Sequence, residues 1–157
     1  MSKPHIAQLN IATLAAPLDS PPLSDFVANL DRINALAEAS AGFVWRPQTD
    51  DGDATGIDFF GPDKIVNLSV WDSIEALHDY VYRSAHIDIM RRKKEWFHTM
   101  REAHMVLWWV PAGHLPSIEE AAQRLEMLRA RGPSAEAFTF KRAFPAPGDV
   151  ATAPTEV

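Results

Sequence analysis

The segment IVNLSVWDSIEALHDYVYRSAHIDIMRRKKEWF, residues 65–97, decides the fold because its hydrophobic period changes within one stretch. Its first seven residues alternate between apolar and mixed positions, which predicts a strand, and Ser73 then offers an N-cap for a helix. We expect that helix to run to Met100, with a break around residues 83–84. A strand followed at once by an amphipathic helix is therefore the unit from which the rest of the chain is interpreted.

His86 lies in the middle of the apolar stripe of this predicted helix. On a helical wheel of about 100° per residue, Lys93 falls within about 20° of His86. We interpret Lys93 first as a snorkelling side chain, which buries its aliphatic stem and keeps its ammonium group in solvent. The apolar members of the stripe are Ile89, Met90, Trp96, Phe97 and Met100. Three interpretations of His86 stay open: a half-buried histidine that bonds a backbone carbonyl or helps to hold a dimer, an acid or base in a pocket, and a metal or haem ligand.

The composition is that of an ordinary globular domain. The 157 residues, 46% of them hydrophobic, are enough for one domain with a substantial core. The absence of cysteine excludes disulfides, thiolate catalysis and sulfur-ligated metal sites. The six histidines show no compact ligand spacing, so no metal site is predicted. A net charge of −6 argues against nucleic acid as a partner.

The two ends of the chain carry no targeting signal that we can identify. The first residues do not resemble a secretory signal and no apolar run reaches membrane-spanning length, so we expect a cytoplasmic protein without membrane contact. Residues 145–157 are rich in Pro, Ala and Thr and lack large apolar side chains, which predicts a disordered tail. Residues 1–144 are then a single domain.

Further elements are predicted on both sides of residues 65–97. The strands are expected over residues 5–13, 42–46, 65–71, 105–110 and 136–141, and the helices over residues 23–39, 73–100 and 117–131. The first of these helices is expected to bury Phe26, Val27, Leu30, Ile33, Leu36 and Ala37. The order is βαββαβ with a C-terminal αβ addition. It predicts an α+β protein of the ferredoxin-like type, in which both main helices cover one face of an antiparallel sheet.

The strands predict two differently used faces of this sheet. In residues 5–13, Ala7, Leu9 and Ile11 form a wholly apolar set, whereas Gln8 and Asn10 belong to a mixed set. A monomer whose helices covered only one face would expose a large apolar patch on the other. We therefore expect a homodimer in which two sheets pack together.

Short motifs along the chain resemble a known group of proteins. The pattern strand-WDS-helix-Ser-x-His between residues 70 and 86 resembles the dimeric α/β barrel superfamily that contains the antibiotic-biosynthesis monooxygenases. The motifs YRSAH, RRKKEWF, LWWVPAGHLPSIEEA and GPSAEAFTF resemble an uncharacterised domain-of-unknown-function family that is grouped with those enzymes, over residues 5–140. The resemblance implies a small dimeric barrel with a pocket between the sheet and its helices.

The resemblance implies two enzymatic hypotheses centred on His86, Asn10 and Trp71. Haem-degrading members use a strand asparagine, a strand-end tryptophan and a helix histidine that binds iron, so haem is a candidate cofactor. Cofactor-independent members deprotonate an aromatic or polyketide-like substrate, which then reduces oxygen; His86 would be the base and Asn10 or Asn67 would stabilise the oxyanion. Further residues expected at the substrate are Trp71, Met90, Lys93, Trp96, Phe97 and Trp109.

Plainer interpretations stay open beside these two. The pairs Trp96–Phe97 and Trp108–Trp109 are also typical of core and dimer packing. A third hypothesis is a dimeric, non-catalytic protein that holds a small hydrophobic or aromatic molecule unchanged. In all three hypotheses the partner is a small molecule, and a resident cofactor is needed only in the haem hypothesis.

Overall fold

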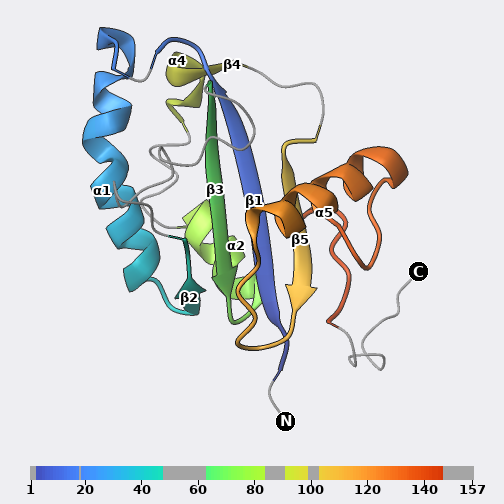
Figure 1. Ribbon diagram of the computed structural model, residues 1–157. Coiled ribbons are helices and arrows are strands. Elements are labelled where there is room, and N and C mark those ends of the chain that lie inside the picture. The colour runs from blue at the N-terminus through green and yellow to red at the C-terminus, as the bar shows by residue number, and fades with distance from the viewer. Residues whose placement is uncertain (1–2, 18, 48–62, 84–90, 99–102, 147–157) are drawn as a thin grey trace.

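The strand β1 (His5–Leu14) is the centre of an antiparallel sheet in the computed structural model (Figure 1). One edge of β1 pairs with β3 (Lys64–Trp71), which pairs in turn with β2 (Phe43–Trp45). The other edge pairs with β5 (Met105–Val110) and, near its end, with the short β4 (Phe97–His98). The order β2-β3-β1-β5 is ferredoxin-like, which confirms the predicted α+β class. The structure describes residues 3–17, 19–47, 63–83, 91–98 and 103–146.

The register of β1 and β3 sorts the side chains of the sheet into two faces. Gln8 lies opposite Ser69, and Asn10 opposite Asn67, so these polar residues share one face. We call this the mixed face; it carries Ile6, Gln8, Asn10, Asn67, Ser69, Trp71, Met105, Leu107 and Trp109. The apolar face carries Ala7, Leu9, Ile11, Val66, Leu68, Val70, Val106, Trp108 and Val110. The two faces predicted from the alternation are confirmed.

The helices α1 (Ser24–Ala39) and α2 (Ile74–Arg83) cover the mixed face. Ala37 of α1 and Leu77 of α2 are buried in one cluster with Ile6, Trp71, Tyr80, Leu107 and Phe138. The predicted N-cap of α2 is confirmed, since Ser73 Oγ accepts a hydrogen bond from the Ala76 amide at 3.1 Å. The α1 helix follows a short 3-10 turn, η1 (Pro21–Leu23).

The stripe expected on α1 is wrong at one position. Phe26 and Ala37 are buried as expected, but Val27 is 41% exposed. Leu30, Ile33 and Leu36 are half-buried. Only a narrow strip of α1 therefore contacts the sheet, because the helix lies over its border beside β2 rather than over its middle (Figure 1).

The helix α5 (Ile118–Arg131) covers the apolar face, on the side of the sheet opposite α2 (Figure 1). Its Ala121, Leu125 and Leu128 are buried in one cluster with the apolar face. The predicted N-cap is confirmed, because Ser117 Oγ accepts from the Glu120 amide at 3.0 Å. The expected homodimer rested on an uncovered apolar face, and α5 of the same chain removes that premise. The homodimer stays a prediction without this support.

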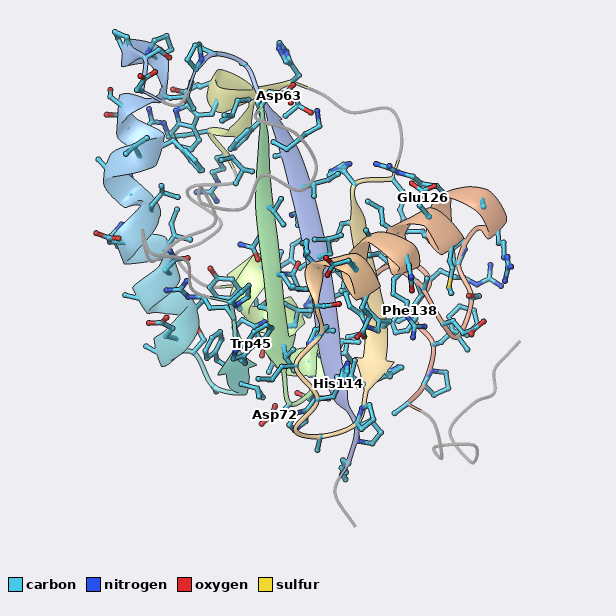
Figure 2. The ribbon with its side chains drawn as sticks, viewed as in Figure 1. Trp45, Asp63, Asp72, His114, Glu126 and Phe138 are labelled. Atoms are coloured by element: carbon cyan, nitrogen blue, oxygen red, sulfur yellow. The ribbon has the colours of Figure 1, made fainter. Side chains whose placement is uncertain are left out.

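Two predicted elements differ from the structure. In place of a strand over residues 136–141, Phe138 alone pairs with Leu107 of β5, through amide-to-carbonyl bonds of 2.8 and 2.9 Å. Figure 2 labels Phe138 beside β5. Turns closed by Ser134–Ala137 and Thr139–Arg142 stand on both sides of this bridge and end the pairing. The short segment still occupies the free edge of β5, which would otherwise be unpaired.

The helix expected to reach Met100 is also wrong at its C-terminal end. The helix α2 is described to Arg83. Residues 84–90 are not described, and within the described residues 91–98 only α4 (Lys93–Trp96) is helical. Phe97 is already in β4, where it pairs with Leu14. At Phe97, backbone pairing with the end of β1 therefore replaces the helix that the hydrophobic period predicts. None of the described helices is long and apolar enough to cross a membrane.

Gly42 offers a test of how β2 joins the sheet. Its φ is +86°, its carbonyl accepts from the Asp72 amide at 2.7 Å, and an added Cβ would lie 2.4 Å from Ala76 Cβ. We expect Gly42→Ala to lower the free energy of unfolding by about 3 kcal/mol, because it adds overlap to backbone strain. Gly113 is the matched control, because its φ is +91° but a Cβ added there would meet no heavy atom beyond its chain neighbours within 4 Å. Gly113→Ala should lower the free energy of unfolding by only about 1 kcal/mol. Equal losses in urea unfolding would show that the close approach does not matter.

Candidate functional site

A cavity of about 240 Å³ lies between the mixed face and the helices α1 and α2. For comparison, roughly 150 Å³ is enough to hold benzene in an apolar protein interior. Asn67 and His104, which both line it near Asn10, are exposed, so the cavity opens to solvent there. Its described lining consists of Gln8, Asn10, Asn34, Ala37, Phe43, Arg46, Pro47, Val66, Asn67, Leu68, Ser69, Trp71, Leu77, Tyr80, Val81, Tyr82, His104 and Met105.

The floor of the cavity is a hydrogen-bonded row on the mixed face. Gln8 Nε2 donates to Asn67 Oδ1 at 2.6 Å and to Ser69 Oγ at 2.8 Å. Trp71 Nε1 donates to the same Ser69 oxygen at 2.9 Å. Gln8 and Ser69 are only 5% and 7% exposed, so these bonds are made where an unpaired polar group would be costly. The row carries no formal charge.

Asn34 brings a further carboxamide to the cavity from α1. Its Nδ2 is buried and has no hydrogen-bond partner among the described residues. A buried amide without a partner costs about 1–3 kcal/mol. Because a carboxamide can turn about its last bond, a ligand oxygen in the cavity would let Asn34 donate and would remove that cost.

Aromatic rings wall the other side of the cavity. Trp71 stacks on Tyr80 with ring centroids 5.1 Å apart and meets the edge of Phe43 at 5.4 Å. Burial raises the pKa of the Tyr80 hydroxyl to about 12, although the positive charge of nearby Arg46 acts in the opposite direction. Tyr80 is therefore a neutral wall residue near neutral pH.

The described lining also contains one guanidinium and one imidazole, which are not part of the floor. Arg46, the residue after β2, places its Nε 2.8 Å from Glu38 Oε2 of α1, and this ion pair offsets the charge of the guanidinium. His104 is the imidazole among the described lining residues, and it is exposed. Among the residues that the structure describes, no group of His, Asp and Glu side chains could hold a metal ion.

The structure brings three of the predicted site residues together. Asn10, Asn67 and Trp71 all line the cavity. Trp109 lies on the mixed face outside the described lining, where its Nε1 donates to the Phe144 carbonyl at 2.9 Å. His86 and Met90 lie outside the described residues, and the side chain of Lys93 is not among those described. The roles predicted for these three residues stay predictions.

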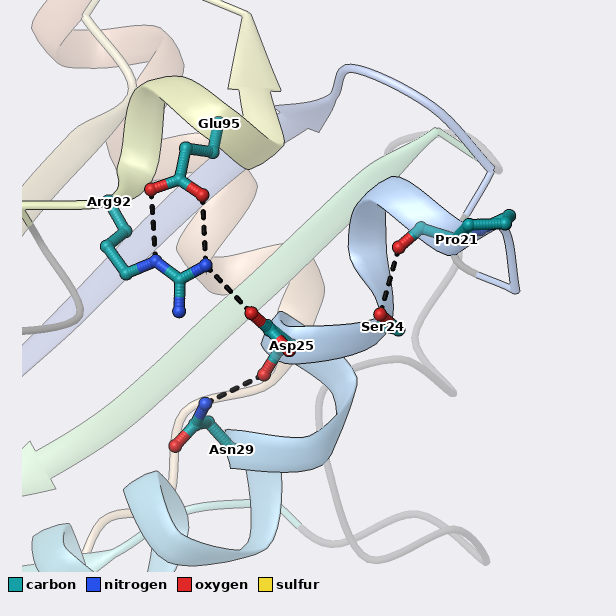
Figure 3. A network of polar contacts seen from close by, with 6 residues as sticks. All are labelled: Pro21, Ser24, Asp25, Asn29, Arg92 and Glu95. Atoms are coloured by element: carbon teal, nitrogen blue, oxygen red, sulfur yellow. Dashed lines mark hydrogen bonds and ion pairs between the residues drawn. The ribbon is translucent and has the colours of Figure 1, made fainter.

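Trp96 and Phe97 lie in a different cluster from the one expected. They pack with Phe26 of α1, at centroid distances of 5.4 and 5.1 Å, near the end of β1 that pairs with β4. Arg92 lies over the Trp96 ring, with its guanidinium carbon 4.7 Å from the ring centroid. The same guanidinium donates to Glu95 and to Asp25 at 2.9 Å each (Figure 3). The two aromatic residues therefore join α4 to α1 and are not part of the described cavity lining.

Sequence reasoning missed three residues that bring hydrogen-bonding side chains to the floor and to α1, Gln8, Ser69 and Asn34, and it also missed the wall residues Phe43 and Tyr80. Gln8 and Ser69 belong to the same mixed sets as Asn10 and Asn67, so the strand alternation already contained them. Asn34 stands three residues before the buried Ala37, within the apolar stripe of α1. A polar residue inside such a stripe is the signal that would have identified it.

Comparison with known proteins gives one family and a small set of related folds. Residues 5–153 match a family described as "Domain of unknown function (DUF3291)". No curated protein matches the chain. SnoaB, described as a cofactor-independent oxygenase from Streptomyces nogalater, has 15% identity and a TM-score of 0.49, over 73% of this chain and 99% of that one.

Two further solved structures have similar values. NE2512, a protein of unknown function from Nitrosomonas europaea, has 14% identity and a TM-score of 0.50, over 74% of this chain and 99% of that one. PA3566 from Pseudomonas aeruginosa has 14% identity and a TM-score of 0.47, over 74% of this chain and 98% of that one. At such identities the likeness to NE2512 concerns the fold alone, and it agrees with the ferredoxin-like topology of the sheet.

Tyr80 provides a spectroscopic test of the cavity wall. Its pKa lies above the ordinary value of 10.0, so the stability gained by keeping the proton is complete below pH 10 and is lost as the pH rises towards 12. We expect the phenolate absorbance after a rapid pH jump to show a step near pH 12 that Tyr80→Phe removes. Tyr82→Phe should leave this step in place. A step near pH 10 in Tyr82→Phe, in which Tyr80 is the remaining tyrosine, would contradict the burial of Tyr80.

Proposed function

We propose that this protein, which belongs to the family described as Domain of unknown function (DUF3291), is a small-molecule enzyme whose cavity binds a planar aromatic or polyketide-like compound. The observation that carries the proposal is the geometry of the floor. Gln8 Nε2 donates a hydrogen bond to Asn67 Oδ1 at 2.6 Å. This bond turns the amide nitrogen of Asn67 away from Gln8, so that the nitrogen can donate to a ligand.

The walls and the floor match different parts of such a ligand. The rings of Trp71, Tyr80 and Phe43 offer flat apolar contacts. The neutral amides of Asn67, Asn10 and Asn34 offer donors for a carbonyl or hydroxyl oxygen on the ring. Preorganised neutral donors stabilise a negative charge that develops on such an oxygen when a neighbouring C–H group loses its proton.

The reaction that we propose is a cofactor-independent oxygenation. A base takes a proton from an activated CH₂ group, and the carbanion, delocalised onto the ring oxygen, transfers electrons to molecular oxygen. For an anthrone the CH₂ group becomes a carbonyl: one oxygen atom of O₂ enters the product and the other leaves as water, together with both hydrogens. The amides would act on the ring oxygen, and the base stays the predicted His86, which lies outside the described residues.

Haem fits the described residues poorly. A haem pocket needs two broad apolar walls and an axial ligand, whereas this floor is a row of amides and a hydroxyl beneath a cavity of about 240 Å³. Haem therefore has no part in the proposed reaction, and the predicted ligation by His86 stays a prediction.

A non-catalytic binding protein is the second candidate. One observation favours it: of the described lining residues His104 is the one with an imidazole, and His104 is exposed to solvent rather than enclosed in the cavity. Saturable binding of anthrones and hydroquinones without any oxygen uptake would select this candidate over the enzyme.

The test of the enzyme is oxygen uptake by Asn67→Asp in a series of anthrones and hydroquinones. This substitution keeps an oxygen for Gln8 Nε2 but replaces the free amide donor with a negative oxygen, so we expect uptake to fall about 100-fold. The control is Asn29→Asp, which adds the same charge on α1, where the Asn29 amide donates to the Asp25 backbone carbonyl. Oxygen uptake by this variant should stay close to that of the wild type. Equal rates in wild type and Asn67→Asp would contradict the role of Asn67.

A further inference from the structure

Ser69 has a hydrogen-bonding state that is fixed by its neighbours. Its Oγ accepts from Gln8 Nε2 at 2.8 Å and from Trp71 Nε1 at 2.9 Å. An indole nitrogen can only donate, so the bond from Trp71 takes one lone pair of the hydroxyl without ambiguity. With a second donor in place, both lone pairs of Ser69 are occupied.

The direction of the Gln8 amide is fixed as well. The same Gln8 nitrogen lies 3.4 Å from the backbone carbonyl of Asn67, which can only accept. The atom facing Asn67 and Ser69 is thus the amide nitrogen, which carries the hydrogens. Gln8 therefore donates to Ser69 and does not accept from it.

These two facts leave one role for the Ser69 hydroxyl proton. A hydroxyl whose lone pairs are both taken can make a further hydrogen bond only as a donor. Among the described residues Ser69 has no acceptor for this proton, and Ser69 lines the cavity while the residue is only 7% exposed. A buried donor of this kind is satisfied by an oxygen that enters the cavity.

We infer that Ser69 is a specificity-determining residue that binds an acceptor oxygen of the ligand, with Gln8 and Trp71 as positioning residues that prevent it from accepting. The inference rests on the proposed function and names its ligand class more closely: uncharged, enolisable aromatic ketones and phenols, with a carbonyl or hydroxyl oxygen directed at the floor. Trp71, whose ring lies in the cavity wall, has in this inference a second role that acts through Ser69.

The test compares two probes with the same bicyclic skeleton, 1-tetralone and tetralin, by titration calorimetry. Tetralone carries one carbonyl oxygen that tetralin lacks, so the ratio of their dissociation constants isolates the oxygen contact from cavity shape. We expect the wild-type protein to prefer tetralone about tenfold. Ser69→Ala should reduce this preference to about twofold, and Ser69→Thr, which keeps the hydroxyl, should restore it.

A second pair of variants keeps the test valid should Ser69→Ala fold poorly. Trp71→Phe removes the indole donor, frees one lone pair of Ser69 and should lower the tetralone preference about threefold. Trp109→Phe is the matched control: it also loses an indole hydrogen bond on the mixed face, to the Phe144 carbonyl, and should leave the ratio unchanged.

The outcomes separate this inference from the proposed function. Binding of both probes with a ratio that Ser69→Ala and Trp71→Phe leave unchanged overturns the inference and leaves the cavity as a binding site. Binding of neither probe by the wild-type protein overturns both. A ratio that falls equally in Trp109→Phe shows a general loosening of the sheet and also overturns the inference.

Discussion

The antiparallel register between β1 and β3 is the constraint on which the rest of the structure depends. It places Gln8 opposite Ser69 and Leu9 opposite Leu68, so the polar and apolar sets of both strands coincide. A shift by one residue would place Gln8 beside an apolar partner and would bury an amide in the layer beneath α5. The same register that builds the two hydrophobic layers therefore assembles the polar floor of the cavity.

Much of this arrangement could be predicted from local patterns. The alternation in β1 and β3, and the caps Ser73 and Ser117, depend only on neighbouring residues, and each is found where it was expected. The differences arise where distant contacts decide. Phe97 follows the helical period in sequence, yet it pairs with Leu14, because the last residues of β1 offer backbone groups that need partners.

The candidate site shows the same division. Asn10, Asn67 and Trp71 could be assigned to one pocket because strand parity puts them on one face. The partners of these residues could not be assigned, since the bond of Gln8 to Ser69 and the position of Asn34 depend on how β1, β3 and α1 meet in space. Nor could sequence patterns separate Trp96 from Trp71. Both tryptophans are almost fully buried, and only the packing of Phe26 on Trp96 shows that they belong to different clusters.

The position of α5 has a consequence for how this fold responds to dilution. An apolar sheet face that is closed by a second chain is protected only at concentrations where the two chains stay associated. Here the apolar face is covered by Ala121, Leu125 and Leu128 of α5, which belongs to the same chain. The connection from β5 tethers α5 to the sheet and sets its effective concentration there. Covering the apolar face is therefore a unimolecular step. The apolar layer behind the polar floor of the cavity then forms without a second chain.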